Sequence, residues 1–362
     1  MINKYTIIMS LFLSIISVVS LKTIINNRSE FFDIINSDNK IEKINEIYND
    51  NIAFKKLFLY IWSEFQNEIG VSLLDDAEYG YIIKDYTGNL YFPSKDVNVE
   101  KFADNLILLS QKLNNKNTPF YYIQAPNKII KGYSSDIVYN YNYSNKNADE
   151  FLKILNEKGV STLDLRELLI TSDIPPDERF YKTDHHWTTK TAFWATKTIV
   201  EFLNKNNNFN LSTQNFNNER YNIIKKNECF LGSLGRRVGS AVSGYDDYTF
   251  IEPNFNTNYE IINGINDEII GSGNFYNAIV KDKILNSDDY ESNKHATYFE
   301  WDYGDIIIKN KMVDNNIKIL LIKDSYALPV GAFLSTCVSE LEMVDLRDTP
   351  KADKIGRASC RE

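Results

Sequence analysis

The amino-acid sequence predicts an α/β domain whose mostly parallel sheet is covered by helices on both faces. Helical and β-prone segments alternate along the chain in three places: residues 98–117 precede 119–126, residues 148–159 precede 160–165, and residues 316–325 precede 327–341 and then 342–347. Each helical segment shows apolar residues at three- and four-residue spacing, whereas each β-prone segment is short and continuous. Such alternation is typical of sheets whose parallel strands are joined by crossover helices.

The overall composition is that of a globular protein with room for a large core. The chain has 362 residues, of which 43% are hydrophobic and 25% charged, so either two or three average domains or one large domain with insertions would fit. The formal net charge is -9 and no basic block occurs. This charge balance argues against a nucleic-acid partner, which would require a concentrated positive surface.

The N-terminus contains the longest apolar run of the chain. Residues 5–21 carry no charge and lie between Lys4 and Lys22, without a small-residue cleavage site after them. We expect residues 1–28 to form an uncleaved membrane anchor, with a cleaved signal peptide or a buried N-terminal helix as alternatives. Either segment would place the rest of the chain outside the cytoplasm. An anchor would keep it at the cell membrane, and a cleaved signal peptide would let it be secreted. The Asn-rich residues 29–78 are predicted to form a membrane-proximal helical segment.

The main domain is predicted to span residues 79–353. It begins with a hairpin over residues 79–93 around Thr87-Gly88-Asn89. Residues 205–305 are Asn-rich and turn-dense, and we assign them to a partly β insertion. The C-terminal residues 354–362, KIGRASCRE, resemble the translation of a sequencing adapter, and we expect them to be non-native.

Two further local features support specific helices. In residues 98–117, apolar side chains at helical spacing are expected to form one helix face: Phe102, Leu106, Leu109 and Leu113. In residues 148–159, Gly159 is expected to be the C-terminal cap of the helix.

The three cysteines give no metal or disulfide pattern. Cys229, Cys337 and Cys360 are far apart, and Cys360 lies in the suspected non-native tail. No disulfide is therefore required. No cofactor is expected.

The motif TDHHWTTKTAFW, residues 183–194, holds two of the three histidines of the chain. Thr188 is a plausible helix N-cap, because apolar residues at helical spacing follow it. Asp184, His185 and His186 are then expected in the loop that leads into this helix, where polar groups can point into a cleft.

A second polar group follows the predominantly apolar run of residues 317–322. Lys323, Asp324 and Ser325 end what we predict to be a buried parallel strand, immediately before a helix. α/β enzymes often expose a nucleophile at this point of the fold.

The two segments together contain the residue types of a serine-based catalytic unit. A serine hydroxyl reacts at neutral pH only when a base takes its proton, and histidine, with a pKa of about 6.5, suits that task. A carboxylate on the second ring nitrogen holds the required tautomer and stabilises the imidazolium. Asp, His and Ser can therefore act as a unit even when they are distant in sequence.

These motifs resemble those of the SGNH-hydrolase-like proteins of the alginate O-acetylation (AlgX/AlgJ) type, most closely their DHHW branch. The resemblance rests on the order of segments between residues 79 and 348: the aromatic hairpin, APNK at 125–128, DLRELL at 164–169, FYKTDHHWT at 180–188, FLGSLGRR at 230–237, KILLIKDSYALP at 318–329 and VDLR at 344–347. DHHWT and KDSY in this order are the specific elements, whereas Pro-x-Lys and GSLG alone would be weak.

The resemblance implies an SGNH-like three-layer sandwich with a permuted motif order, because Asp and His precede Ser. It implies Ser325 as nucleophile, His186 as base and Asp184 as the orienting carboxylate. The substrate class that it implies is acetyl esters of a cell-surface or exported polysaccharide, and it also implies a membrane-bound partner protein that supplies acetyl groups.

Each of these positions has a structural alternative. His186 could cap the helix or bind a carbonyl group, Asp184 could interact only with the helix dipole, and Ser325 could be a helix N-cap, a role for which Asp324 competes. His185 is expected to pack or to form hydrogen bonds locally, with direct catalysis as the alternative.

Further residues are weaker candidates for contact with substrate. They are Lys128, His185, Trp187 and Tyr326, and Arg236 and Arg347 could also contact an anionic substrate. For Trp187 a place in the core is the alternative, and for the charged residues it is a solvated surface.

A metal site formed by Asp184, His185 and His186 is less well supported. Zinc would require a further ligand, and His295 lies in the predicted insertion without a neighbouring ligand motif. For the oxyanion of acyl transfer, the Ser325 N–H is the one donor that the sequence identifies, and a second donor is expected but not located.

Two classes of function follow from the sequence. The first is an exported esterase or O-acetyltransferase with a covalent acetyl-Ser325 intermediate. The second is a protein of the same fold that catalyses no reaction. It would be a catalytically idle glycan-binding or scaffold subunit of a polysaccharide modification or export complex. A structural surface protein with coincidental motifs is a third alternative.

Overall fold

The structure is a computed structural model that describes residues 4–35, 39–130, 136–140, 142–207, 209–300 and 303–348. The chain forms two compact units, Met1–Gly70 and Val71–Glu362, which we describe separately. The predicted non-native tail, residues 354–362, and the last residues assigned to the domain lie outside the described residues.

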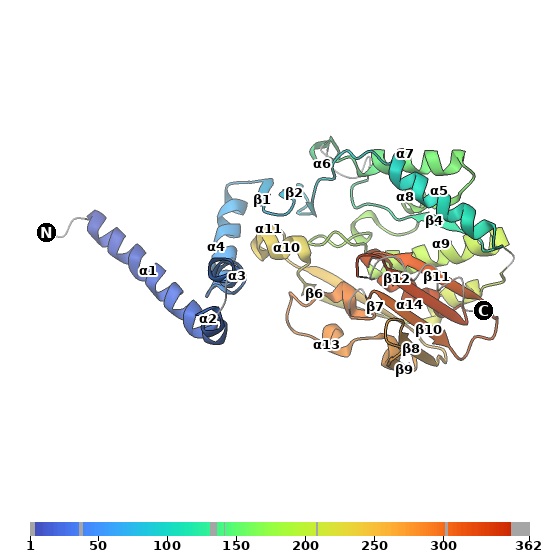
Figure 1. Cartoon of the computed structure of the whole chain (residues 1–362). Coiled ribbons are helices and arrows are strands. Elements are labelled where there is room, and N and C mark those ends of the chain that lie inside the picture. Colours follow the sequence, from blue (N-terminus) through green and yellow to red (C-terminus); the bar gives the residue numbers. More distant parts are fainter. Residues whose placement is uncertain are drawn as a thin grey trace. The chain divides into compact units, whose positions relative to one another are not determined.

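The first unit is helical (Figure 1). Its helices are α1 Lys4–Asn26, α2 Arg28–Ile35, α3 Lys40–Asn51 and α4 Lys55–Glu68. Within α1, residues Ile7–Asn26 are long and apolar enough to cross a membrane. A 20-residue helix rises about 30 Å, the thickness of a bilayer's hydrocarbon core. This helix is consistent with either an anchor or a signal sequence.

The second unit contains both strands and helices. Its strands are β1 Leu73–Asp76, β2 Gly80–Lys84, β3 Leu90–Tyr91, β4 Tyr121–Gln124, β5 Ser161–Asp164, β6 Tyr221–Phe230, β7 Asp246–Pro253, β8 Tyr259–Asn263, β9 Ile269–Gly273, β10 Asp305–Asn310, β11 Lys318–Lys323 and β12 Glu340–Asp345. Its α-helices are α5 Glu100–Asn114, α6 Asp136–Asn140, α7 Ser144–Glu157, α8 Leu165–Ile170, α9 Thr189–Asn207, α10 Ser233–Val238, α11 Ser240–Ser243, α12 Phe275–Ile279, α13 Asp282–Leu285 and α14 Leu328–Leu334.

The strands form one five-stranded sheet and three smaller ones. The five-stranded sheet has the order β11-β12-β10-β8-β9, β1–β2–β3 form a three-stranded sheet, and β4–β5 and β6–β7 form pairs. Figure 1 shows α5, α7 and α8 around β4 at one side of the second unit, and β8, β9 and β10 at the other. The α/β class predicted from the sequence is confirmed.

The expectation of a mostly parallel sheet needs correction. Among the described strands, β4–β5 and β11–β12 are parallel, and the other pairs are antiparallel. The reason lies in residues 205–305, where β8 and β9 are joined by a short turn. Antiparallel neighbours need only such a turn, whereas parallel ones need a crossover. These residues thus contribute β8 and β9 to the main sheet.

Local predictions had mixed outcomes. The hairpin is confirmed, because β2 and β3 pair antiparallel across residues 85–89. Gly159 ends the α7 segment with a positive φ of 77°, as expected for a C-terminal cap. The helix predicted from the spacing of apolar residues is confirmed as α5, but its apolar face differs in part from the prediction. Ala103, Ile107 and Ser110 are the buried residues, Leu106 is partly buried, and Phe102 is exposed.

The strand before Ser325 is also less buried than predicted. β11 is the end strand of its sheet, and Leu320 and Ile322 are 39% and 36% exposed. Its other face packs against the main core, through Ile319 and Leu321. β11 therefore holds the following turn from one side, and α14 packs against α9 beyond that turn.

Candidate active site

The loop before α9 is closed by main-chain hydrogen bonds. Phe180 and Trp187 form an antiparallel bridge, and Tyr181 N donates to His186 O at 3.2 Å. Thr188 acts as the predicted N-cap, because its Oγ1 accepts a hydrogen bond from Thr191 N at 3.3 Å. The loop between these points therefore projects Asp184 and His186 from the start of a long, buried helix.

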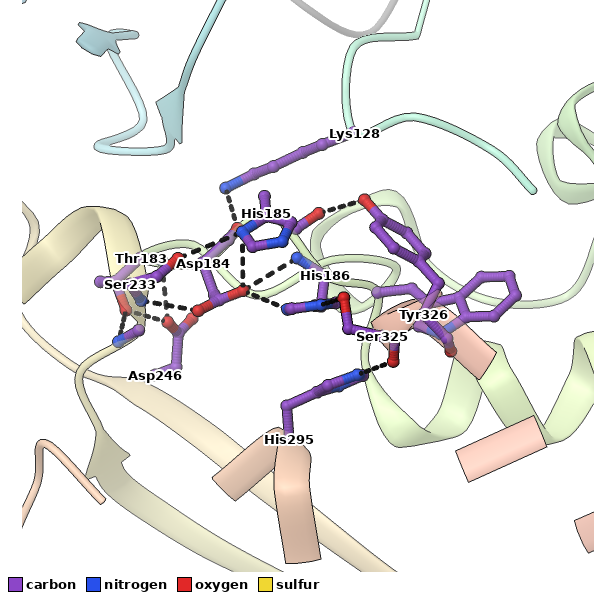
Figure 2. Close-up of polar contacts among 12 residues, drawn as sticks. Lys128, Thr183, Asp184, His185, His186, Ser233, Asp246, His295, Ser325 and Tyr326 are labelled. Carbon is purple, nitrogen blue, oxygen red and sulfur yellow. Dashed lines mark hydrogen bonds and ion pairs between the residues drawn. The ribbon is translucent and has the colours of Figure 1, made fainter. Parts of the chain in front are cut away.

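The structure brings Asp184, His186 and Ser325 together (Figure 2). Asp184 Oδ1 lies 2.7 Å from His186 Nδ1, and His186 Nε2 lies 2.8 Å from Ser325 Oγ. A carboxylate only accepts hydrogen bonds, so Nδ1 carries the proton and Nε2 is free to accept from the Ser325 hydroxyl. This is the geometry that a serine needs for activation by a histidine base.

Ser325 stands at a sharp turn between β11 and α14. Asp324 caps this turn, because its Oδ1 accepts from Tyr326 N at 3.0 Å. Asp324 therefore serves as the N-cap that Ser325 could have been, and the Ser325 hydroxyl can donate to His186 instead. Among the described residues, no hydrogen bond involves the Ser325 N–H. Its role as an oxyanion donor stays a prediction.

The segment Gly232–Ser233 holds the far side of Asp184. Ser233 N donates to Asp184 Oδ2 at 2.6 Å, and His186 N donates to Asp184 Oδ1 at 3.0 Å. A Cβ atom at Gly232 would lie 2.4 Å from Asp184 Cβ and 2.6 Å from Thr183 O, so the close approach requires glycine. Burial opposes ionisation of Asp184, but hydrogen bonds from His186 and Ser233 hold its pKa well below the usual value.

A second buried carboxylate braces the same loop. Asp246, at the start of β7, accepts hydrogen bonds from Thr183 N at 2.8 Å and from Thr183 Oγ1 at 2.5 Å. Gly232 N in turn donates to Thr183 Oγ1 at 2.7 Å. Burial raises the pKa of Asp246. The hydrogen bonds between Thr183 and Asp246 were not predicted, because no local sequence signal connects position 246 with position 183.

Lys128 points inward and supports the loop. Its Nζ donates to the carbonyl groups of Leu90, Lys182 and Asp184, at 2.8, 2.7 and 3.1 Å. Burial lowers the pKa of its ammonium group to about 8. These contacts assign Lys128 to positioning the loop, in contrast to the substrate contact considered from the sequence.

His185 contacts Asp184 and Ser233 but not Ser325. Its Nδ1 lies 3.1 Å from Ser233 Oγ and 3.4 Å from Asp184 Oδ1. Burial, followed by the neighbouring His186, lowers the pKa of His185 to about 4. The side chain therefore forms local hydrogen bonds as a neutral ring at neutral pH.

Trp187 and Tyr326 connect the two sequence segments of the site. Trp187 Nε1 donates to Tyr326 O at 2.9 Å, and the Tyr326 hydroxyl donates to His185 O. Trp187 is buried, which agrees with the core alternative for this residue. The two aromatic residues thus lock the histidine loop against the serine turn.

His295 is a further residue of the site that the sequence did not identify. Its ring stacks on that of His186, with centroids 3.8 Å apart and an interplanar angle of 14°. Its Nε2 lies 2.8 Å from the carbonyl oxygen of Ser325. Burial, and then the charge of His186, lower the pKa of His295 well below its usual value. The signal for this role was weak: a lone histidine among 101 residues of irregular sequence, 205–305.

The remaining candidates do not join the triad. Arg236 Nη1 donates to Glu291 O at 2.6 Å, and Arg347 pairs with Asp345 at 2.6 Å. Ligand atoms of Asp184, His185 and His186 lie within 4.8 Å of one another, a spacing that a metal ion could use. Hydrogen bonds to Ser233 and Ser325 already explain these positions, so the absence of a metal stays a prediction.

The second unit is an α/β fold in which Asp184, His186 and Ser325 form a continuous series of hydrogen bonds. Residues 87–249 match the family described as SGNH hydrolase-like domain, acetyltransferase AlgX. The relationship to the SGNH-hydrolase-like family predicted from the motifs is thereby confirmed. A comparison with curated protein sequences gave no match.

Solved structures show the same fold at low sequence identity. PatB1 of Bacillus cereus is 20% identical over 76% of this chain and 90% of its own, with a TM-score of 0.62. A second PatB1 structure, with a sulfonyl adduct, gives 20% identity, 77% and 90% coverage and a TM-score of 0.60. A DHHW family protein from Eubacterium siraeum is 17% identical over 76% of this chain and 85% of its own, with a TM-score of 0.57.

Proposed function

We propose that the chain is an extracytoplasmic O-acetyltransferase or acetylesterase that acts on acetyl groups of a cell-surface or exported polysaccharide. The observation that carries the proposal is the continuous hydrogen-bonded series from Asp184 through His186 to the Ser325 hydroxyl. The family description, which names an acetyltransferase, supports the acyl group. The apolar helix α1 supports a location at the outer side of a membrane.

The first half-reaction transfers the acetyl group to the protein. Ser325 Oγ attacks the carbonyl carbon of the acetyl ester while His186 Nε2 takes the hydroxyl proton. The Ser325 N–H donates to the developing oxyanion, and Asp184 stabilises the imidazolium through Nδ1–H. When the tetrahedral intermediate breaks down, His186 returns the proton to the leaving sugar oxygen. Acetyl-Ser325 and a free sugar hydroxyl result.

The second half-reaction repeats these steps with a new nucleophile. His186 removes a proton from water or from a sugar hydroxyl, which attacks acetyl-Ser325, and the proton then returns to Ser325 Oγ. Water gives an esterase and acetate, whereas a sugar hydroxyl gives a transferase and an acetylated glycan. A membrane-bound partner protein that supplies acetyl groups fits the transferase alternative.

The test compares the purified full chain with Ser325→Ala on an activated acetyl ester and on acetylated glycans. Acetate release and acetyl transfer to glycan are measured separately. We expect the variant to lose at least about a thousand-fold in kcat. Ser272→Ala, an exposed serine on β9, is the matched control and should keep full activity.

A second probe uses covalent labelling. Because a relative of the same fold was solved with a sulfonyl adduct, we expect phenylmethanesulfonyl fluoride to label Ser325. The serine oxygen forms a bond to sulfur, fluoride leaves, and His186 takes the hydroxyl proton. Peptide mass spectrometry locates the adduct. Equal acetate release and transfer by wild type and Ser325→Ala would overturn the enzyme proposal and leave the idle glycan-binding or scaffold subunit and the structural surface protein as alternatives.

A further inference from the structure

We infer that His295 is a positioning residue for the reaction proposed above. Its side chain keeps the ring of His186 and the main chain of Ser325 at the separation and orientation that the proton transfer needs. This inference rests on the proposed function. The observation behind it is that one side chain contacts both reacting groups: the His186 ring by stacking and Ser325 by a hydrogen bond to its carbonyl oxygen (Figure 2).

The backbone around His295 is itself held firmly. His295 lies in a short 3-10 helix, Lys294–Thr297, and Lys281 N donates to Thr297 O at 2.8 Å. The buried Lys294 donates to Ile284 O at 2.6 Å and to Ser287 O at 2.8 Å. His295 therefore provides a fixed surface against which the His186 ring can rest.

The chemistry of the His295 ring suits this position. A carbonyl oxygen can only accept, so His295 Nε2 carries a proton, and burial, which holds the pKa of His295 well below its usual value, keeps the ring neutral. When His186 becomes an imidazolium, it faces a neutral aromatic ring and meets no second positive charge. The stacked ring also restricts rotation of the His186 imidazole, which would otherwise move Nε2 away from Ser325 Oγ.

Two variants separate the two contacts. His295→Phe keeps an aromatic face and removes the hydrogen-bond donor, whereas His295→Gln keeps an N–H donor and removes the ring. We expect His295→Ala to lower kcat and the rate of Ser325 sulfonylation by about ten-fold or more, with KM nearly unchanged. His295→Phe and His295→Gln should each recover part of that loss.

The readouts distinguish this inference from the proposed function. If Ser325 is sulfonylated but no acetyl group is released or transferred, the proposed function fails, while the labelling rates still test His295. If His295→Ala lowers the melting temperature but the folded protein is labelled at the wild-type rate, the residue is only structural. Equal labelling rates in all variants would overturn the inference.

A separate observation concerns α4 in the first unit. We propose that this helix lies in the interface of a lipid bilayer, beside the point where α1 enters it. Along α4 and its flanks, apolar side chains that are 42–59% exposed recur at three- and four-residue spacing: Phe54, Leu57, Phe58, Ile61, Trp62, Phe65 and Ile69. The covered side of the helix instead carries Ser63, which is fully buried.

This orientation is the reverse of that in an ordinary surface helix, whose apolar side faces the protein. An exposed stripe that contains Trp and Phe matches the composition of helices in membrane interfaces, where aromatic residues concentrate. Trp62 and Phe65 stack with centroids 5.7 Å apart. Lys55 and Lys56 are balanced by Glu64 and Glu68, so apolar insertion is expected to outweigh attraction to anionic lipids.

The start of α4 is tied to the end of the apolar span. Ala53 N donates to Thr23 Oγ1 at 2.9 Å, and Asn27 Nδ2 donates to Asn51 O at 3.2 Å. Thr23 lies one turn before the end of the span Ile7–Asn26. If α1 crosses the membrane, these bonds place the first turn of α4 at the boundary between hydrocarbon and headgroups.

The test uses the full chain in phosphatidylcholine liposomes, with and without brominated acyl chains. The emission of Trp62 is obtained as the difference between wild type and Trp62→Phe, and we expect bromine to lower it about two-fold or more. Leu57→Glu combined with Ile61→Glu should abolish this quenching. Phe102→Glu, at an exposed apolar position of the second unit, should leave it unchanged.

Other occupants of the apolar side would give different results. Emission of Trp62 that bromine does not quench, but that is shielded from aqueous acrylamide, would show that protein covers the helix, and the proposal would fail. Failure of the chain to float with the liposomes would also overturn it, because α1 would then not be inserted.

Discussion

His186 Nε2 lies 2.8 Å from Ser325 Oγ, although 139 residues separate the two in sequence. The contact depends on the histidine loop and the serine turn being locked together by Trp187 and Tyr326. The proposed chemistry can therefore be tested at several residues that never touch the substrate.

Asp184→Asn should keep the fold near neutral pH and lower kcat. An asparagine amide cannot hold the His186 proton on Nδ1, so the wrong tautomer accumulates, and we expect a loss on the order of a thousand-fold or more. The measurement is kcat for an acetyl ester. Normal kcat in Asp184→Asn would mean that the carboxylate has no part in the reaction.

The same carboxylate should affect stability in acid. The pKa of Asp184 is lower in the folded than in the unfolded protein, so its stabilising contribution is complete above the unfolded value of about 3.9. That contribution is lost as the pH falls through the folded value. Melting temperatures between pH 6 and pH 2.5 should therefore fall more steeply in wild type than in Asp184→Asn.

Ser233 supports Asp184 through its main-chain N–H, which a proline can remove. Ser233 is the first residue of α10, a position where proline fits the helix. We expect Ser233→Pro to lower kcat about ten- to a hundred-fold, because Asp184 Oδ2 loses its donor, with a change in stability of about 1–2 kcal/mol. Ser233→Ala keeps the N–H and should retain nearly full activity. Equal effects of both changes would contradict a main-chain role.

His185→Gln should leave most of the activity intact. The His185 ring contacts Ser233 and Asp184 but not Ser325, and it is neutral at neutral pH because its pKa is about 4. We expect kcat to fall less than about ten-fold, whereas His186→Gln should remove at least about a hundred-fold of the activity. A loss as large as that of His186→Gln would restore the direct catalytic role for His185.

Lys128 should make stability rise with pH in the mildly alkaline range. Its pKa is about 8 in the folded protein and about 10.4 in the unfolded chain, so the unfolded state binds more protons between these values. Stability therefore increases as the pH rises above 8, by no more than about 3 kcal/mol. Urea unfolding at pH 7.5–9.5 should show this increase in wild type and a smaller one in Lys128→Met.

The three residues of the proposed triad could be selected from the sequence because each lies beside a local signal. Asp184 and His186 precede a helix whose N-cap, Thr188, can be read from the sequence, and Ser325 follows a strand whose residues 319–322 are all apolar. These signals are local, and the family resemblance connected them. The α/β class followed from alternating segments in the same way.

What the sequence did not predict depends on long-range packing. Asp246 and Gly232 reach Thr183 across the fold, and His295 reaches His186 from a segment with no regular periodicity. Strand direction was missed for a similar reason, since β8 and β10 pair in a register that only the assembled sheet defines. Which side of α5 is exposed depends on which side the neighbouring elements cover, and this too is decided by long-range packing.

The wide separation of Asp184 and Ser325 along the chain also has a consequence for biosynthesis. While a polypeptide is being made, its early parts can fold before later ones emerge. A segment ending before residue 325 has a base and a carboxylate but no alcohol for them to activate. Reactivity would therefore arise only after residue 325 has been made and has packed against the histidine loop, and shorter unfinished chains could not cleave esters by this route.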